Sequence, residues 1–188
     1  MNLSALKSPP FRSYVVSLHL ALNGFWAQRV IIGWLAWEMT GSAGFVGLVA
    51  FLNFFPTLFV SPLFGVFADR IDVRKGSILS YALAGILSSL FAGLCIFGSS
   101  TPILLALFSF VTGVISSANH PMRMSLTPRL APAGDLPSVV AITSLNFNMS
   151  RLTGPAIGGI LIQTIGAPLA FAVTAVTYAA PVTAIYFM

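Results

Sequence analysis

The feature that most constrains this chain is the succession of long apolar stretches that fills it. Each stretch reaches, or comes close to, the roughly 20 residues that a helix needs to cross the hydrocarbon core of a bilayer. The six stretches are Tyr14–Trp37, Phe45–Phe67, Ser77–Phe97, Pro102–Asn119, Val139–Ile162 and Ala167–Met188. The sequence therefore predicts an all-α, polytopic membrane protein with six transmembrane helices.

The composition agrees that lipid is the main solvent of this chain. Of its 188 residues, 57% are hydrophobic and only 7% are charged, and the mean hydropathy is +0.94. A soluble domain of this size needs far more charge to cover its surface. A net charge of +5 would suggest nucleic acid as a partner of a soluble protein. In this chain we expect the lipid bilayer as partner and no nucleic acid.

Basic residues mark one side of the predicted membrane domain. They precede the first apolar stretch or lie in the connections after the second and the fourth: Lys7, Arg12, Arg70, Arg74, Lys75, Arg123 and Arg129. The other connections, around Glu38–Gly44, Gly98–Thr101 and Thr164–Gly166, contain no Lys or Arg. Because loops rich in Lys and Arg stay in the cytoplasm, the N-terminus is predicted to be cytoplasmic. Six crossings then return the C-terminus to the same side.

An internal repeat divides the chain into two units of three helices, residues 14–97 and 102–188. A shift of 93 positions (146 − 53) superposes Leu52-Asn53-Phe54 on Leu145-Asn146-Phe147, Pro62 on Pro155 and Gly65 on Gly158. Three helices is an odd number, so the second unit is inverted in the membrane relative to the first, as in many transporters. Alternatively, both helices use proline and glycine simply to bend near one end.

A charged motif follows the second apolar stretch on the predicted cytoplasmic side. It reads Gly65-Val-Phe-Ala68-Asp69-Arg70-Ile-Asp72-Val-Arg74-Lys75. Gly65 permits close approach of a neighbouring helix. Asp69, beside Arg70 and Arg74, can form charge-assisted bonds across a cytoplasmic interface. The simpler interpretation is an ordinary basic loop with incidental acids.

A second motif lies in the fifth stretch and reads Gly154-Pro155-Ala-Ile-Gly158-Gly159. Pro155 removes a backbone hydrogen bond and bends the helix, and the glycines permit tight packing on a neighbour. We expect a packed seam that keeps a transport cavity from leaking. Small-residue packing of this kind also occurs in other helix bundles.

The two motifs resemble signatures of the major facilitator superfamily. The loop is similar to the pattern G-x-L-A-D-R-x-G-R-K/R, although Asp72 and Val73 replace its second glycine and a basic residue. The glycine-proline motif resembles the one associated with exporters of that superfamily. An aspartate at position 72 is familiar in the subgroup that includes the enterobactin exporter and macrolide-efflux proteins. The fourth stretch lacks the intramembrane Arg of many proton-coupled relatives.

The resemblance implies the N-terminal six-helix half of a twelve-helix transporter in the bacterial cytoplasmic membrane. Its expected activity is secondary active export by alternating access with proton antiport, and uptake by the same fold is the alternative. The charged loop would then act as a latch that holds the cytoplasmic side shut: Gly65, Asp69, Arg70, Asp72, Arg74 and Lys75. The chain stops at Met188 without a polar tail, so we expect a missing C-terminal half or a second copy to complete the transporter.

Two arginines, Arg29 and Arg151, lie near the middle of predicted helices. An arginine at the centre of a membrane helix costs roughly 2.5–3.5 kcal/mol on insertion scales, and no carboxylate lies deep in any of the six stretches. Three explanations are open: the arginines have partners in the missing half, the substrate itself is anionic, or the side chains snorkel outward. An anionic substrate would require a cavity for a small amphiphilic anion such as a siderophore or a drug. The candidate cavity residues are Asn23, Trp26, Arg29, Asn146 and Arg151.

Other function classes find little support in the residues. Glu38, at the outer end of the first stretch, is the candidate for coupling transport to protons. Catalysis in the membrane would need a nucleophile with a base, or clustered metal ligands, and the sequence contains no such set. We therefore predict no enzyme activity, no cofactor and no metal, with Cys95 as a small packing residue. A non-transporting fragment or scaffold of six helices remains the third interpretation.

Overall fold

The structure is a computed structural model that describes residues 4–68, 72–131 and 134–188, with residues 63–68 described by their backbone alone. All regular structure in these residues is helical. The elements are η1 (Ser4–Lys7), α1 (Pro9–Thr40), α2 (Ala43–Ala68), α3 (Val73–Ile96), α4 (Pro102–Leu126), η2 (Thr127–Leu130), α5 (Leu136–Val176) and α6 (Ala179–Tyr186). Within the described residues, five helices are long and apolar enough to cross a membrane. The prediction of an all-α membrane protein is confirmed.

Local signals in the sequence begin and end several of these helices. The Asp72 carboxylate accepts hydrogen bonds from the backbone N–H groups of Arg74 (2.9 Å) and Lys75 (3.3 Å), which caps the start of α3. The Thr101 hydroxyl accepts from the N–H of Leu104 at the start of α4. Gly41 ends α1 with a φ of 59°, and its N–H donates to the carbonyl of Trp37 at 2.7 Å.

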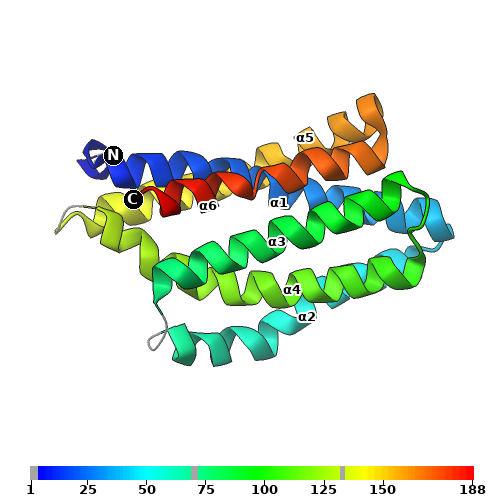
Figure 1. Cartoon of the computed structure of the whole chain (residues 1–188), viewed down its shortest axis with the longest axis horizontal. Helices are drawn as coiled ribbons and strands as arrows, with labels where there is room; N and C mark the ends of the chain where they lie inside the picture. The colour runs from blue at the N-terminus through cyan, green and yellow to red at the C-terminus, as the bar shows by residue number, and fades with distance from the viewer. Residues whose placement is uncertain (1–3, 69–71, 132–133) are drawn as a thin grey trace.

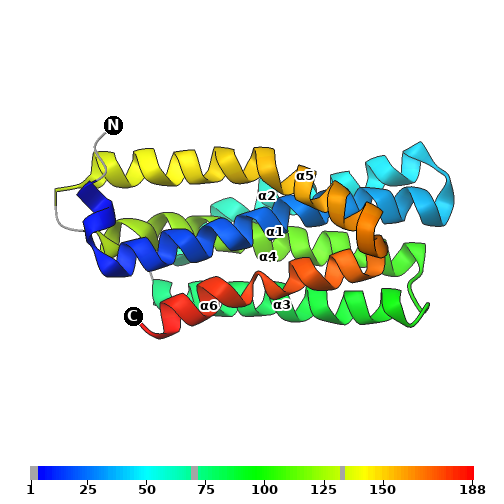
Figure 2. The ribbon, with the colours of Figure 1, turned by 90° about the horizontal axis from the view of Figure 1, so that it is seen from above.

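The fifth and sixth predicted stretches form one long element, α5, followed by the short helix α6. Gly166 interrupts α5 with φ 79° and ψ 159°, a conformation that only glycine adopts readily. The chain turns back there, and its last part runs toward the opposite end of the molecule (Figure 1 and Figure 2). The element α5 therefore consists of two helical runs that meet at Gly166, because one glycine makes the turn without a separate loop.

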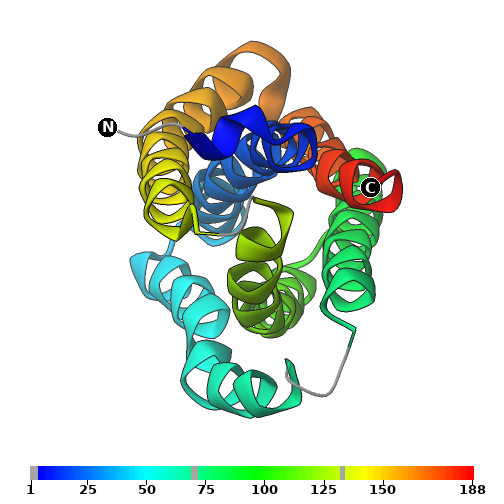
Figure 3. The same cartoon turned by 90° about the vertical axis from the view of Figure 1, so that its left-hand side faces the viewer.

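The helices form a bundle with α1 and α4 in its middle, as the end-on view in Figure 3 shows. Helix α1 packs against α5, α6 and α2, and α4 packs against α2 and α3. Large apolar side chains elsewhere point outward, for example Phe51, Leu58 and Phe59 of α2. In a bilayer such side chains face lipid, which has the same polarity as they do.

The two ends of the bundle differ in charge. The start of α1, the start of α3 and the end of α4 lie at the same end as the C-terminus (Figure 1). The described basic residues outside the helix centres gather there: Lys7, Arg12, Arg74, Lys75, Arg123 and Arg129. The α1–α2 connection, the α3–α4 connection and the turn within α5 lie at the opposite end. The predicted asymmetry of charge is therefore present in the fold.

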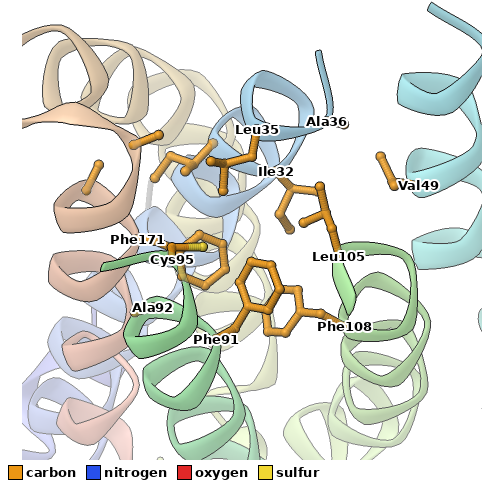
Figure 4. Close-up of a cluster of buried hydrophobic side chains, with 13 residues drawn as sticks. Ile32, Leu35, Ala36, Val49, Phe91, Ala92, Cys95, Leu105, Phe108 and Phe171 are labelled. Atoms are coloured by element: carbon orange, nitrogen blue, oxygen red, sulfur yellow. The ribbon is translucent and has the colours of Figure 1, made fainter. Parts of the chain in front are cut away.

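An aromatic cluster closes the bundle toward the end that lacks basic residues. The rings of Phe91 and Phe108 stack with centroids 4.5 Å apart, and Phe171 packs on both at 5.4 and 5.2 Å (Figure 4). Leu35 of α1 and Leu105 of α4 are buried in the same cluster. These contacts join α1, α3, α4 and α5 into a dry apolar layer.

Candidate functional site

A cavity of about 380 Å³ lies between the helices, on the basic side of the aromatic cluster. Its wall comes from all five long helices and from Tyr178, just before α6. The apolar part of the wall includes Phe25, Trp26, Phe54 and Phe147. The polar and charged part is Gln28, Arg29, Asn53, Thr57, Ser61, Ser80, Tyr81, Thr112, Ser116, Ser117, Asn119, His120, Arg123 and Tyr178. A wall that combines aromatic side chains with polar groups is typical of small-molecule sites.

Arg29 is the charged residue in the deep part of this wall. Its guanidinium donates to the Oδ1 of Asn53 at 2.7 Å and lies over the Phe54 ring, 3.9 Å from the centroid. The rings of Phe25 and Trp26 lie 5.2 and 5.4 Å from the same group. Each of these described partners is neutral, so they stabilise the cation through its faces and one hydrogen bond without cancelling its charge.

Asn53 is held so that its oxygen faces Arg29. Its amide nitrogen donates to the carbonyl of Ser109 at 3.2 Å and to the Thr112 hydroxyl at 3.1 Å, both on α4. The same turn of α4 leaves no room for a side chain at Gly113, because an added Cβ would collide with the carbonyl oxygen of Asn53. The close contact between α2 and α4 therefore positions the residue that orients Arg29.

Two predicted cavity residues, Asn23 and Asn146, lie in the seam between α1 and α5 and do not line the cavity. The Oδ1 of Asn146 lies 2.6 Å from Nδ1 of His19, and its amide nitrogen donates to the carbonyl of Val15 at 3.1 Å. The amide nitrogen of Asn23 lies 3.1 Å from Nε2 of His19 and 3.3 Å from the Ser150 hydroxyl. The structure therefore brings the two asparagines together through His19.

The glycines of the fifth-stretch motif have different neighbours. A Cβ on Gly154 would lie 2.9 Å from the carbonyl oxygen of Asn23, and one on Gly158 would lie 2.9 Å from that of Ala27. Both glycines thus let α5 approach the backbone of α1. Gly159 has open space around its Cβ direction, and Pro155 is half-buried within α5. The predicted seam has two contacting glycines and one that faces outward.

The other predicted site residues whose side chains the structure describes do not line the cavity. Arg151 is exposed, with its guanidinium 5.7 Å from the Trp26 ring, and Glu38 is exposed near the end of α1. In the charged loop, Arg74 donates to the carbonyls of Ile185 (3.0 Å) and Tyr186 (3.1 Å) at the end of α6. Lys75 is exposed. Gly65 belongs to the part of α2 described by its backbone alone, and Asp69 and Arg70 lie outside the described residues.

Sequence reasoning missed several residues of the wall. Gln28 is 4% exposed, and its Oε1 accepts from Tyr178 at 3.1 Å and from Ser88 at 3.4 Å. Gln28 belongs to no motif, and the signal that could have identified it is a polar side chain near the middle of a membrane helix. Arg123 was assigned to the basic connection after the fourth stretch, and the cavity extends to it and to His120.

The comparisons with known proteins agree with this architecture. A family model described as "transmembrane secretion effector" matches residues 1–188. The chain belongs to the major facilitator superfamily. This multi-pass membrane protein is therefore related to transporters rather than to enzymes. No solved structure matches it significantly.

Three relatives of this superfamily member show the range of similar proteins. It is 26% identical to the Staphyloferrin A transporter of Staphylococcus aureus, over 86% of this chain and 41% of that protein. It is 26% identical to the multidrug efflux pump Tap of Mycobacterium tuberculosis, over 95% of this chain and 44% of that protein. It is 31% identical to the enterobactin exporter EntS of Escherichia coli, over 88% of this chain and 40% of that protein. The chain thus spans less than half the length of these curated relatives.

Proposed function

We propose that this chain is the N-terminal half of a secondary active exporter of small amphiphilic anions, working by alternating access and proton antiport. The observation that carries the proposal is Arg29, a cation in an aromatic cavity wall whose described partners are all neutral. A buried charge is costly unless it is paired. An anionic substrate that stacks on Phe25, Trp26 or Phe54 supplies both the charge and the apolar contact.

The names of the relatives narrow the chemical class. Two of them are named for staphyloferrin A and for enterobactin, and a third for multidrug efflux. A siderophore or an acidic drug is therefore the proposed substrate. Bacterial inner membrane is the proposed location, with the basic end of the bundle and the N-terminus in the cytoplasm.

The inverted repeat of six crossings receives support from two equivalent contacts. Asn53 of α2 bonds Thr112 of α4, and Asn146 of α5 bonds His19 of α1. Both pairs are related by the shift found in the sequence, since 146 − 53 and 112 − 19 each equal 93. In each pair the second helix of one unit holds the first helix of the other. An inverted repeat predicts this exchange of contacts.

The position of the cavity suggests how alternating access uses this half. The cavity lies on the basic side of the Phe91–Phe108–Phe171 cluster, which closes the opposite side. We propose that this arrangement is the cytoplasm-facing state and that the charged loop, residues 65–75, holds the cytoplasmic side in the other state. A C-terminal half or a second copy would complete the cavity. Glu38 remains the proposed acid for proton coupling within this chain.

The experiment is efflux from cells that lack their own siderophore and drug exporters. Arg29→Gln should reduce export of an anionic aromatic substrate at least tenfold, because the charge is lost, whereas Arg129→Gln, outside the cavity wall, should leave export unchanged. Accumulation of substrate inside cells that express the protein would favour the uptake alternative. Equal export by wild type and Arg29→Gln, at matched protein levels, would rule out an anion site at Arg29.

A further inference from the structure

We propose that the cavity has a second anion-binding subsite at Arg123, and that its ligands are elongated dianions with an aromatic body. The inference rests on the proposed function, in which Arg29 binds the first acidic group. The inference narrows the proposed substrates to dianions, and it predicts that cationic amphiphiles do not bind in this cavity.

The first observation is that the wall carries a second guanidinium. Arg123, in the last turn of α4, lines the same cavity as Arg29 and is half-buried. Its guanidinium lies 5.8 Å from the Phe147 ring, and within the described residues it forms no side-chain hydrogen bond or ion pair. His120, one turn earlier, lines the wall beside it. Arg29 and Arg123 thus place two guanidinium groups on the wall of one cavity.

The second observation is an excess of hydrogen-bond donors. The side-chain nitrogens Nε2 of Gln28 and Nε1 of Trp26 are buried without a hydrogen-bond partner in the described residues, and both residues line the cavity. No Asp or Glu of the described residues lines it. Buried donors without acceptors are costly, so the ligand that fits this wall is rich in acceptor oxygens. A cationic ligand would leave these donors unpaired.

The spacing of the two subsites sets the length of the ligand. Arg29 is bonded to Asn53, which is bonded to Thr112 of α4. Arg123 lies 11 residues (123 − 112) further along α4, which is about 16 Å along a helix that rises 1.5 Å per residue. Allowing for the reach of both side chains, the two acidic groups lie about 10–16 Å apart. Phe25, Trp26 and Phe147 line the space between them.

The test compares two ligands with the same body. Biphenyl-4,4′-dicarboxylate is a rigid dianion of suitable length, and its monomethyl ester is the matched monoanion. Binding is measured by calorimetry with the complete transporter, purified in lipid nanodiscs together with the half or copy that completes the cavity. The wild type should bind the dianion about tenfold or more tighter than the monoester, as expected for one additional charge-assisted contact.

Variants separate this inference from the proposed function. Arg123→Gln should remove the preference for the dianion and leave the affinity for the monoester within about twofold, and Arg123→Lys should keep much of the preference. Arg29→Gln should weaken both ligands, and Arg129→Gln neither. If the monoester binds through Arg29 but the dianion binds no tighter, the second subsite is refuted and the proposed function stands. If the wild type binds neither ligand, both are refuted.

Discussion

Nδ1 of His19 lies 2.6 Å from Oδ1 of Asn146, and this contact joins α1 to α5. The amide nitrogen of Asn146 donates to the carbonyl of Val15, so its oxygen faces the ring, and the Ser150 hydroxyl lies 3.0 Å from the same Nδ1. The amide nitrogen of Asn23 donates to the carbonyl of His19 and lies 3.1 Å from Nε2. His19 is thus the centre of a polar network between α1 and α5.

Removing the acceptor of this contact should destabilise the seam. Asn146→Ala removes the 2.6 Å contact to Nδ1 of His19 and the hydrogen bond to the Val15 carbonyl, which costs about 1–3 kcal/mol even though the Ser150 hydroxyl stays 3.0 Å from Nδ1. We expect a lower unfolding temperature in detergent, measured by intrinsic fluorescence. Asn148→Ala is the control, because the Asn148 side chain is exposed and bonds only the carbonyl of Ser144 on its own helix. If both variants have the same unfolding temperature, the contacts of Asn146 between α1 and α5 do not stabilise the protein.

A side chain at Gly158 should separate α1 from α5. The ideal Cβ lies 2.9 Å from the carbonyl oxygen of Ala27 and 3.0 Å from its Cα, and backbone atoms cannot rotate away. Gly158→Val should therefore cost about 1–3 kcal/mol or more through overpacking, and reduce the yield of monodisperse protein on size-exclusion chromatography. Gly159→Val, with nothing within 4 Å of its Cβ, should behave like wild type. Loss of yield in both variants would point to a general effect of valine in this helix.

The cap at the start of α3 gives a prediction about the charged loop. Asp72→Ala removes the acceptor of the Arg74 and Lys75 N–H groups and should cost about 1 kcal/mol. Asp72→Asn keeps an acceptor oxygen and should restore most of this stability. Thermal unfolding of the three proteins checks the order. If the Asn variant is as unstable as the Ala variant, the carboxylate acts through its charge rather than as a cap.

Arg74 should protect the last turn of α6 from solvent. Its guanidinium donates to two carbonyls, those of Ile185 and Tyr186, and a partly exposed contact of this kind is worth about 1 kcal/mol. Arg74→Gln should raise hydrogen exchange in residues 183–188 roughly fivefold. Lys75→Gln also removes one positive charge but leaves these hydrogen bonds in place, so hydrogen exchange in residues 183–188 should match that of the wild type. Unchanged exchange in Arg74→Gln would show that the end of α6 is held by other contacts.

Part of the site was predictable because some residue types are costly in lipid wherever they point. Arg29 stood out in the sequence for that reason, and it lies in the cavity wall. Arg151 carried the same signal, but it is exposed in this structure. Asn23 and Asn146 were predicted to be cavity residues, but they join α1 to α5 through His19 rather than lining the cavity. The free-energy cost of placing a polar or charged side chain in the membrane indicates that the residue needs a partner. It does not indicate which residue or ligand that partner is.

The sequence by itself determined that the chain crosses a membrane, that its basic residues gather on one side, and that it carries the motifs of its superfamily. These properties depend on local composition and on spacing along the chain. Only the tertiary structure decided that Gln28 and Arg123 line one cavity and that Gly166 folds the chain back within α5. The physical reason is that lipid tails are as apolar as a packed helix interface. Apolar helices therefore carry little pattern that distinguishes a buried face from an outer one, and contacts between distant residues such as Arg29 and Asn53 make that choice.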